Sequence, residues 1–136
     1  MVSPSPEIKQ LILDWYERIA SGEMVAAAEH ILSQEQSFLA VGIDATEWFW
    51  DRKDLIRAYR ETAKLGKPEI DVKQIEAFQE GTVGWALDMV MFRRPGKSEI
   101  PMRHTFVLHQ EVDGWKVIHA HYSFPTPDET LVPAEE

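Results

Sequence analysis

The sequence predicts an α+β fold in which helices cover one face of a curved antiparallel sheet. Apolar residues recur at helical spacing over the first half of the chain and at strand-like spacing over the second half. The strand-like segments are separated by the turn pairs Glu80-Gly81, Pro95-Gly96 and Asp113-Gly114. No internal repeat or linker is recognisable, so one domain is expected over residues 1–136, with an ordered core at about 6–125 and an acidic, proline-containing tail at 126–136.

Three helices are expected in the first half of the chain. Ser5 is a favourable N-cap and is followed by a proline, which fits the first helical position, so the first helix should begin there and stop at Gly22. A short alanine-rich helix should follow over residues 24–32. Asp51 is the expected cap of the third helix, which Gly66 ends.

Strands are expected where β-branched and aromatic residues replace the helical spacing. Residues 37–43 favour a short strand, and an aromatic segment at 47–50 follows a turn. The remaining strands should form a meander over residues 69–78, 82–93, 99–110 and 115–124.

Composition excludes several classes of function. The formal net charge of -9 argues against binding to nucleic acid, and the adjacent Arg93 and Arg94 are interpreted as a solvated hairpin end. The chain has no cysteine, which excludes disulfides, thiolate zinc sites and iron–sulfur clusters. Neither a signal peptide nor a membrane-spanning run is recognisable, so a cytoplasmic location without membrane association is expected.

The final hairpin, residues 102–124, holds four of the five histidines. A two-residue loop at Asp113-Gly114 would set Phe106 against His121, whereas a three-residue loop that starts at Val112 would set His104 against Tyr122. The second register is preferred because it separates an apolar face from a polar face. It also predicts the pairs Leu108 with Ile118, Thr105 with His121 and Val107 with His119.

The strand before this hairpin can be placed by pairing charges. Arg94 opposite Glu99 gives a favourable pair across the intervening turn. This phase puts Trp85 and Met89 on the apolar face and Asp88 on the polar face.

The apolar face carries His104 and Tyr122 side by side at its centre. Two interpretations remain open. His104 could be a core histidine hydrogen-bonded to the tyrosine hydroxyl, or the two residues could be the polar groups that orient an apolar or aromatic ligand in a cavity. In the second, His104 would act as a base and the Tyr122 hydroxyl would donate to a developing oxyanion. The other expected ligand-binding residues are Trp15, Trp48, Tyr59, Trp85, Met89 and Phe106.

The polar face carries another candidate, the row Asp88, Thr105 and His121, in which a carboxylate could orient an imidazole for catalysis. A subunit interface or structural hydrogen bonding would explain the same row. His119 and His121 could ligate a metal ion, but no third ligand accompanies them, so neither a metal nor a cofactor is expected. No Gly-x-Ser-x-Gly nucleophile elbow and no glycine-rich phosphate loop is present.

Several segments resemble one known family. Residues 113–123 resemble the last strand of SnoaL-like domains in the nuclear-transport-factor-2-like superfamily, also called ketosteroid isomerase-like or cystatin-like. Residues 38–42 with Glu47 and Trp48 resemble its first strand and turn, residues 80–86 resemble its central strand, and the likeness covers roughly residues 8–124. The resemblance implies a cone-shaped half-barrel, with a pocket between the concave sheet and the helices and a homodimer through the outer sheet face.

The resemblance supplies two functional hypotheses. The first is a small-molecule-binding protein, with lyase, isomerase or cyclase chemistry if it is an enzyme, as in polyketide cyclases, ketosteroid isomerase, limonene epoxide hydrolase and scytalone dehydratase. The alternative is a non-catalytic dimerisation or association module that uses the outer sheet face, as in the association domain of calcium/calmodulin-dependent kinase. That domain has a pocket arginine where this chain has Tyr122, which argues against an anionic carboxylate ligand.

Overall fold

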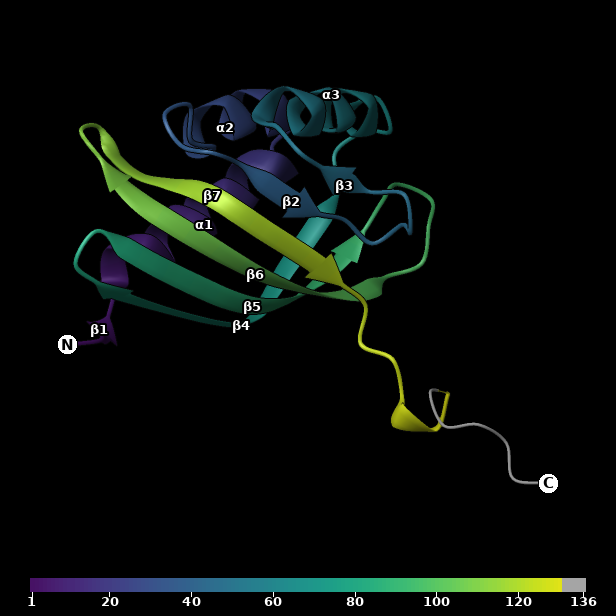
Figure 1. Cartoon of the computed structure of the whole chain (residues 1–136). Helices are drawn as coiled ribbons and strands as arrows, with labels where there is room; N and C mark the ends of the chain where they lie inside the picture. Colours follow the sequence, from purple (N-terminus) through teal and green to yellow (C-terminus); the bar gives the residue numbers. More distant parts are fainter. Residues whose placement is uncertain (131–136) are drawn as a thin grey trace.

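The computed structural model describes residues 1–130, which form three helices packed on one side of a curved sheet of seven strands (Figure 1). This arrangement confirms the predicted α+β class. The elements, in chain order, are β1 (Ser3–Pro4), α1 (Pro6–Ala20), α2 (Met24–Ile31), β2 (Leu39–Val41), β3 (Trp48–Phe49), α3 (Arg52–Ala63), β4 (Glu69–Glu80), β5 (Val83–Arg93), β6 (Ile100–Glu111), β7 (Gly114–Ser123) and a 3-10 turn (Asp128–Thr130). The expected tail, 126–136, lies partly outside the described residues.

The strand order is β1-β4-β5-β6-β7-β2-β3, and the sheet is mixed rather than antiparallel throughout. β2 runs parallel to β7, with Leu39 opposite His119, whereas the other neighbouring strands are antiparallel. The hairpin turns of the meander impose antiparallel pairing, but no hairpin joins β2 to β7. The sheet does not close into a barrel, because β1 and β3 form its two edges.

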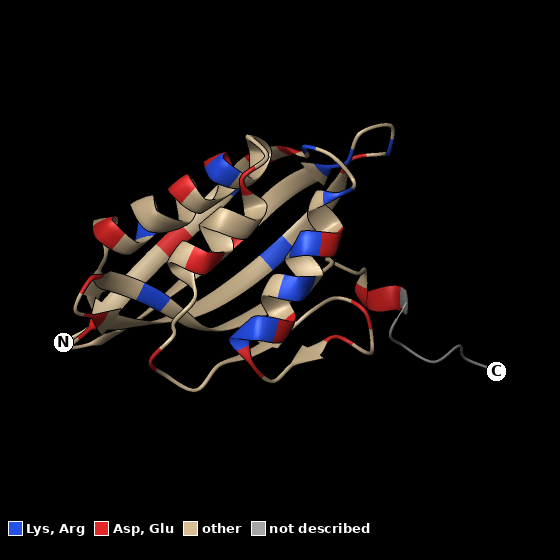
Figure 2. Cartoon of the chain, turned by 90° about the horizontal axis from the view of Figure 1, so that it is seen from above, with Lys and Arg blue, Asp and Glu red and all other residues tan. Residues whose placement is uncertain are grey.

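Both long helices begin at the side chains that the sequence predicts. Ser5 Oγ accepts a hydrogen bond from the Ile8 amide at 3.2 Å, and an Asp51 carboxylate oxygen accepts one from the Asp54 amide at 2.9 Å. Each cap satisfies an amide that the first helical turn leaves without a partner. Acidic and basic residues are mixed along α3 (Figure 2), and Lys53, Arg57, Arg60 and Glu61 are exposed, as expected of a solvated face. Within residues 1–130, no helix combines the length and apolar character needed to cross a membrane.

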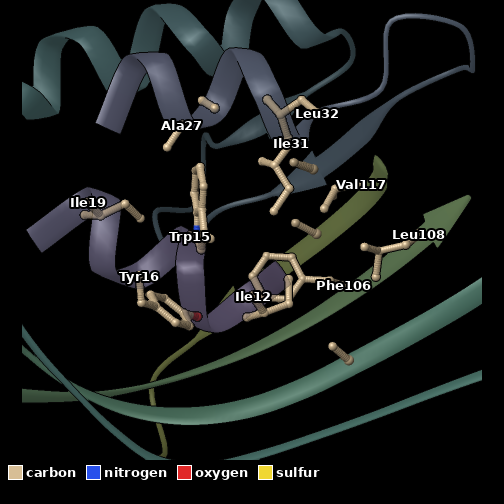
Figure 3. Close-up of a cluster of buried hydrophobic side chains, with 14 of the residues drawn as sticks. Ile12, Trp15, Tyr16, Ile19, Ala27, Ile31, Leu32, Phe106, Leu108 and Val117 are labelled. Carbon is tan, nitrogen blue, oxygen red and sulfur yellow. The ribbon is translucent and has the colours of Figure 1, made fainter. Parts of the chain in front are cut away.

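The core lies between the three helices and the concave face of the sheet. Figure 3 shows Ile12 of α1 beside Phe106 of β6, while Trp15 extends toward α2 and Tyr16 toward the sheet. The helix α1 approaches the sheet closely at Gly84 of β5, where an added Cβ would lie 2.3 Å from Cδ1 of Ile8. Glycine at this position therefore allows the helix to pack closely against the concave face.

The central register of the last hairpin is confirmed, but its loop is not. His104 pairs with Tyr122, and the pairing continues unchanged from Arg103 to Val107. Nearer the turn, Leu108 pairs with Val117 instead of Ile118, because the register shifts by one residue there. The loop is the two-residue Val112-Asp113, closed by Glu111 opposite Gly114. A bulge thus supplies the offset that the sequence interpretation assigned to a longer turn.

The predicted phase of β5 is wrong by one residue. Asp88 lies opposite His104 on the concave face, and the inward residues are Asp88 and its alternate neighbours. Trp85 and Met89 consequently lie on the outer face, where Trp85 stacks on Phe78. The physical reason is the connection: residues 94–99 form a loop outside both strands, so Arg94 and Glu99 do not pair across a tight turn.

Candidate functional site

A cavity of about 360 Å³ lies between the helices and the concave face of the sheet. Its wall is mostly apolar and aromatic, with a few hydroxyl groups, one imidazole, one carboxylate and one guanidinium. Such a wall suits an organic molecule, because burial of its apolar body is favourable and the few polar groups can fix its orientation. The lining residues include Trp15, Tyr16, Glu47, Phe49, Leu55, Ala58, Tyr59, Val90, Phe92, Arg94, Met102, His104, Phe106, Tyr122 and Phe124.

Three polar side chains meet at one wall of this cavity. The His104 Nδ1 atom lies 2.7 Å from Oδ1 of Asp88, and the Tyr16 hydroxyl donates to Oδ2 of the same carboxylate at 2.5 Å. The Tyr16 hydroxyl oxygen also lies 2.9 Å from His104 Nδ1. The Asp88 side chain is 1 % exposed and the His104 side chain 8 % exposed. We call Tyr16, Asp88 and His104 the buried triad.

The hydrogen bonds of the buried triad assign the tautomer of His104. A carboxylate can only accept, so His104 Nδ1 carries the proton that it donates to Asp88. In the neutral ring, Nε2 is then the acceptor. Nε2 makes no hydrogen bond to any residue from 1 to 130, and His104 is part of the cavity wall. Nε2 is therefore the nitrogen of this cavity-lining ring that is left to accept a proton.

The Tyr16 hydroxyl serves as a donor over the whole neutral pH range. Burial raises the pKa of Tyr16 well above its ordinary value, and the nearby charge of Asp88 raises it further. Because the phenol stays protonated, it can hold Oδ2 of Asp88 while Oδ1 holds His104. The carboxylate is thus fixed by two donors from two different elements, α1 and β6.

A second pair of hydroxyl groups lies beside the triad. The hydroxyls of Tyr59, from α3, and Tyr122, from β7, are in direct hydrogen-bond contact. The Tyr122 ring meets the His104 ring edge-on, with centroids 4.8 Å apart at an interplanar angle of 77°. Burial raises the pKa of Tyr122 to about 12, against a smaller lowering by the Tyr59 hydroxyl, so both can donate at neutral pH.

The structure brings most of the predicted ligand-binding residues together. His104, Tyr122, Phe106, Tyr59 and Trp15 all lie in the cavity wall. Asp88, predicted for the opposite face, is behind this wall and holds His104. The remaining predicted residues, Trp48, Trp85 and Met89, are not among the cavity-lining residues.

Each misplaced residue has a local reason. Trp85 and Met89 face outward because of the shifted β5 register. Trp48 belongs to edge strand β3 and is 54 % exposed, stacked on Trp50 with ring centroids 6.1 Å apart. These aromatic rings therefore pack against each other outside the cavity.

The predicted row of Asp88, Thr105 and His121 does not form. Thr105 does face His121 in the register, but Asp88 points to the concave side and contacts His104 instead. His119 Nδ1 lies 2.8 Å from the Leu39 carbonyl oxygen, a contact that joins β7 to β2. Within residues 1–130, no group of three histidine, cysteine, aspartate or glutamate side chains is placed to hold a metal ion.

The sequence interpretation did not include Tyr16, which is the third member of the buried triad. A signal was present: Tyr16 is four residues after Ile12 and three before Ile19, so it falls on the apolar stripe of α1. A tyrosine on such a stripe reaches the core with its ring and needs a polar partner for its hydroxyl. Asp88 is that partner.

A profile of the SnoaL-like domain family matches residues 8–127. The chain belongs to this family. Solved structures with the same fold include a candidate dehydratase of the nuclear-transport-factor-2-like family from Streptomyces avermitilis, at a TM-score of 0.79 and 14 % identity over 89 % of this chain and 95 % of that one. No curated protein sequence matches the chain.

Two further structures agree with this SnoaL-like architecture. A nuclear-transport-factor-2-like protein of unknown function from Pseudomonas putida has a TM-score of 0.79 and 18 % identity, over 94 % of this chain and 91 % of that one. A candidate ketosteroid isomerase from Parabacteroides distasonis has a TM-score of 0.72 and 14 % identity, over 90 % and 91 %. At these identities the comparisons establish the fold, while any activity depends on the cavity itself.

Proposed function

We propose that this SnoaL-like domain binds an apolar or aromatic carbonyl compound in its cavity and transfers a proton from carbon to His104. This proposal is supported by the pairing of a cavity-lining imidazole with a buried carboxylate. Nδ1 of His104 lies 2.7 Å from Oδ1 of Asp88. Carboxylate–imidazole pairs of this kind act as general bases because the carboxylate orients the ring and stabilises its cationic form. The reaction class is a lyase, isomerase or cyclase reaction that begins with loss of a proton next to a carbonyl group.

Each polar group has a separate role in the proposed step. His104 Nε2 takes the proton from the carbon atom, and the electron pair left behind moves onto the carbonyl oxygen as an enolate. Asp88 stabilises the imidazolium that results, while Tyr16 holds the carboxylate in place. With Tyr59 donating to the Tyr122 oxygen, the Tyr122 proton is free to stabilise the enolate oxygen.

The names of two similar structures agree with this reaction class. These two are named as a candidate dehydratase and a candidate ketosteroid isomerase. Both reactions require proton transfer to or from an organic molecule. In this chain, the cavity and the buried triad supply a base for such a step.

The proposed step can be tested without knowing the natural substrate, by following deuterium exchange from D2O into 2-tetralone, an aromatic ketone with acidic α-hydrogens. We expect the wild-type protein to accelerate exchange above the buffer rate and His104→Gln to abolish the acceleration. Tyr122→Phe should retain part of it, since loss of one oxyanion donor costs roughly 10²–10³ in rate. His121→Gln is the matched control, because His121 lies on the outer face of the same hairpin. Equal exchange in wild type and His104→Gln would contradict the proposal.

We also propose that a second copy of this chain packs against the outer face of the sheet. This face exposes apolar side chains, since Leu87 is 45 % and Val83 42 % exposed, and Trp85 and Met89 lie on the same side. Exposed apolar groups that gather on one face are typical of interaction surfaces. Light scattering should give a dimer at micromolar concentration that Leu87→Asp converts to a monomer. A monomeric wild-type protein would exclude this second function.

A further inference from the structure

Among residues 1–130, Arg94 is the arginine or lysine that lines the cavity. The sequence had placed it at a solvated hairpin end instead. Arg94 extends the inward row of β5, in which Asp88, Val90 and Phe92 alternate toward the cavity. The guanidinium carbon lies 5.2 Å from the centroid of the Phe92 ring. Its neighbour Arg93 faces the other way and forms an exposed ion pair with Glu69. The adjacent arginines thus have different environments.

The guanidinium of Arg94 has no acceptor among the residues that the structure describes. No carboxylate of residues 1–130 lies within ion-pair distance, and no hydrogen bond from its nitrogen atoms is formed with them. Glu47, the acidic residue of the same cavity wall, already accepts a hydrogen bond from the Asp44 amide at 2.8 Å. Arg94 therefore offers its donors to whatever molecule occupies the cavity.

Distance along the strand separates Arg94 from the buried triad. Successive inward residues of a strand lie roughly 7 Å apart, so the backbone of Arg94 is about 20 Å from that of Asp88. Val90, Phe92 and Met102 form the apolar wall between the two ends. A ligand that reaches both ends must be elongated, with an apolar body and a group at one end that suits a guanidinium.

We propose that Arg94 binds an anionic oxygen group, of the carboxylate class, at the end of the ligand remote from His104. A guanidinium presents a planar fork of donors that matches a carboxylate, and the Phe92 ring holds it in place. This inference rests on the proposed function and adds the class of ligand. It also revises the expectation that the cavity would not bind an anionic carboxylate. That expectation came from Tyr122 of β7, which replaces a pocket arginine, but Arg94 supplies a cation from the end of β5.

Two fluorescent probes with the same aromatic body test this inference. Anilinonaphthalene sulfonate carries an anionic oxygen group and N-phenyl-1-naphthylamine does not. We expect Arg94→Gln to weaken binding of the anionic probe about tenfold or more, as for a lost charge-assisted hydrogen bond, and to leave the neutral probe unchanged. Arg94→Lys should recover part of the affinity, and Arg93→Gln, the matched control on the outer face, should change neither probe.

The possible failures of this experiment are distinguishable. If the wild type binds both probes and Arg94→Gln binds the anionic probe equally well, the proposed role of Arg94 would be overturned. The cavity would still stand as a binding site. Ala58→Trp places a large ring in the cavity wall and should weaken both probes. Absence of probe binding in the wild type, or binding that survives Ala58→Trp, would overturn the proposed function together with this inference.

Discussion

Removal of the Tyr16 hydroxyl should lower the stability of the protein, chiefly through Asp88. Tyr16→Phe keeps the ring in the core but leaves Oδ2 of a carboxylate that is 1 % exposed without its donor at 2.5 Å. A hydrogen bond to a charged group contributes about 1.5–3 kcal/mol, and an unsatisfied buried charge is costlier still. We therefore expect the free energy of unfolding to fall by about 2 kcal/mol.

The origin of this loss can be isolated with a double-mutant cycle measured by urea denaturation. In an Asp88→Asn background the charge is already absent, so Tyr16→Phe should cost well under 1 kcal/mol there. The interaction energy between the two positions should thus be about 1–2 kcal/mol. Losses that add with no interaction energy would refute the reasoning, because Tyr16 would then stabilise the core by packing alone.

Two other predictions concern packing and pH. Gly84→Ala should lower the free energy of unfolding by about 1–3 kcal/mol, since its Cβ would lie 2.3 Å from Ile8 Cδ1 and 2.9 Å from the Phe78 carbonyl oxygen. Adding Ile8→Val should restore part of the loss in thermal unfolding, and an unchanged Tm in Gly84→Ala would contradict this packing. Burial raises the pKa of Tyr122 from an ordinary value near 10 to about 12. The folded protein therefore holds this proton more tightly, and the resulting stability is complete below pH 10 and lost as the pH rises to about 12. Tyr122→Phe should make the stability curve less steep in that window, and an unaltered slope would contradict the pKa shift.

The parts of the fold that were predictable are those governed by local rules. Ser5 and Asp51 are capping residues whose side chains satisfy nearby amides, so sequence suffices to locate both helix starts. The pairing of His104 with Tyr122 followed from the need to keep apolar residues on one face. His104 of the buried triad, on β6, and Tyr122, on the neighbouring β7, were therefore found from sequence.

The parts that were not predictable depend on loop length and distant pairing. The connection at residues 94–99 is too long to fix a register, and a slip of one residue turned Asp88 to the wrong face. The parallel pairing of β2 with β7 joins segments about eighty positions apart, with Leu39 opposite His119. Because no turn connects the two strands directly, the sequence carries no local signal for this pairing. Arg94 was misread for the same reason as Asp88, because it directly follows β5 and continues the inward row of that strand.

Asp88 accepts the Nδ1 proton of His104, which leaves Nε2 of this cavity-lining ring unprotonated. Nitrogen-15 NMR of the histidine rings tests this central claim most directly, because the shifts of the two ring nitrogens report which of them carries the proton. At a pH where His104 is neutral, we expect a protonated Nδ1 and an unprotonated Nε2, and a shift toward mixed tautomers in Asp88→Asn. A protonated Nε2 in the wild type, or the same spectrum in Asp88→Asn, would contradict the account.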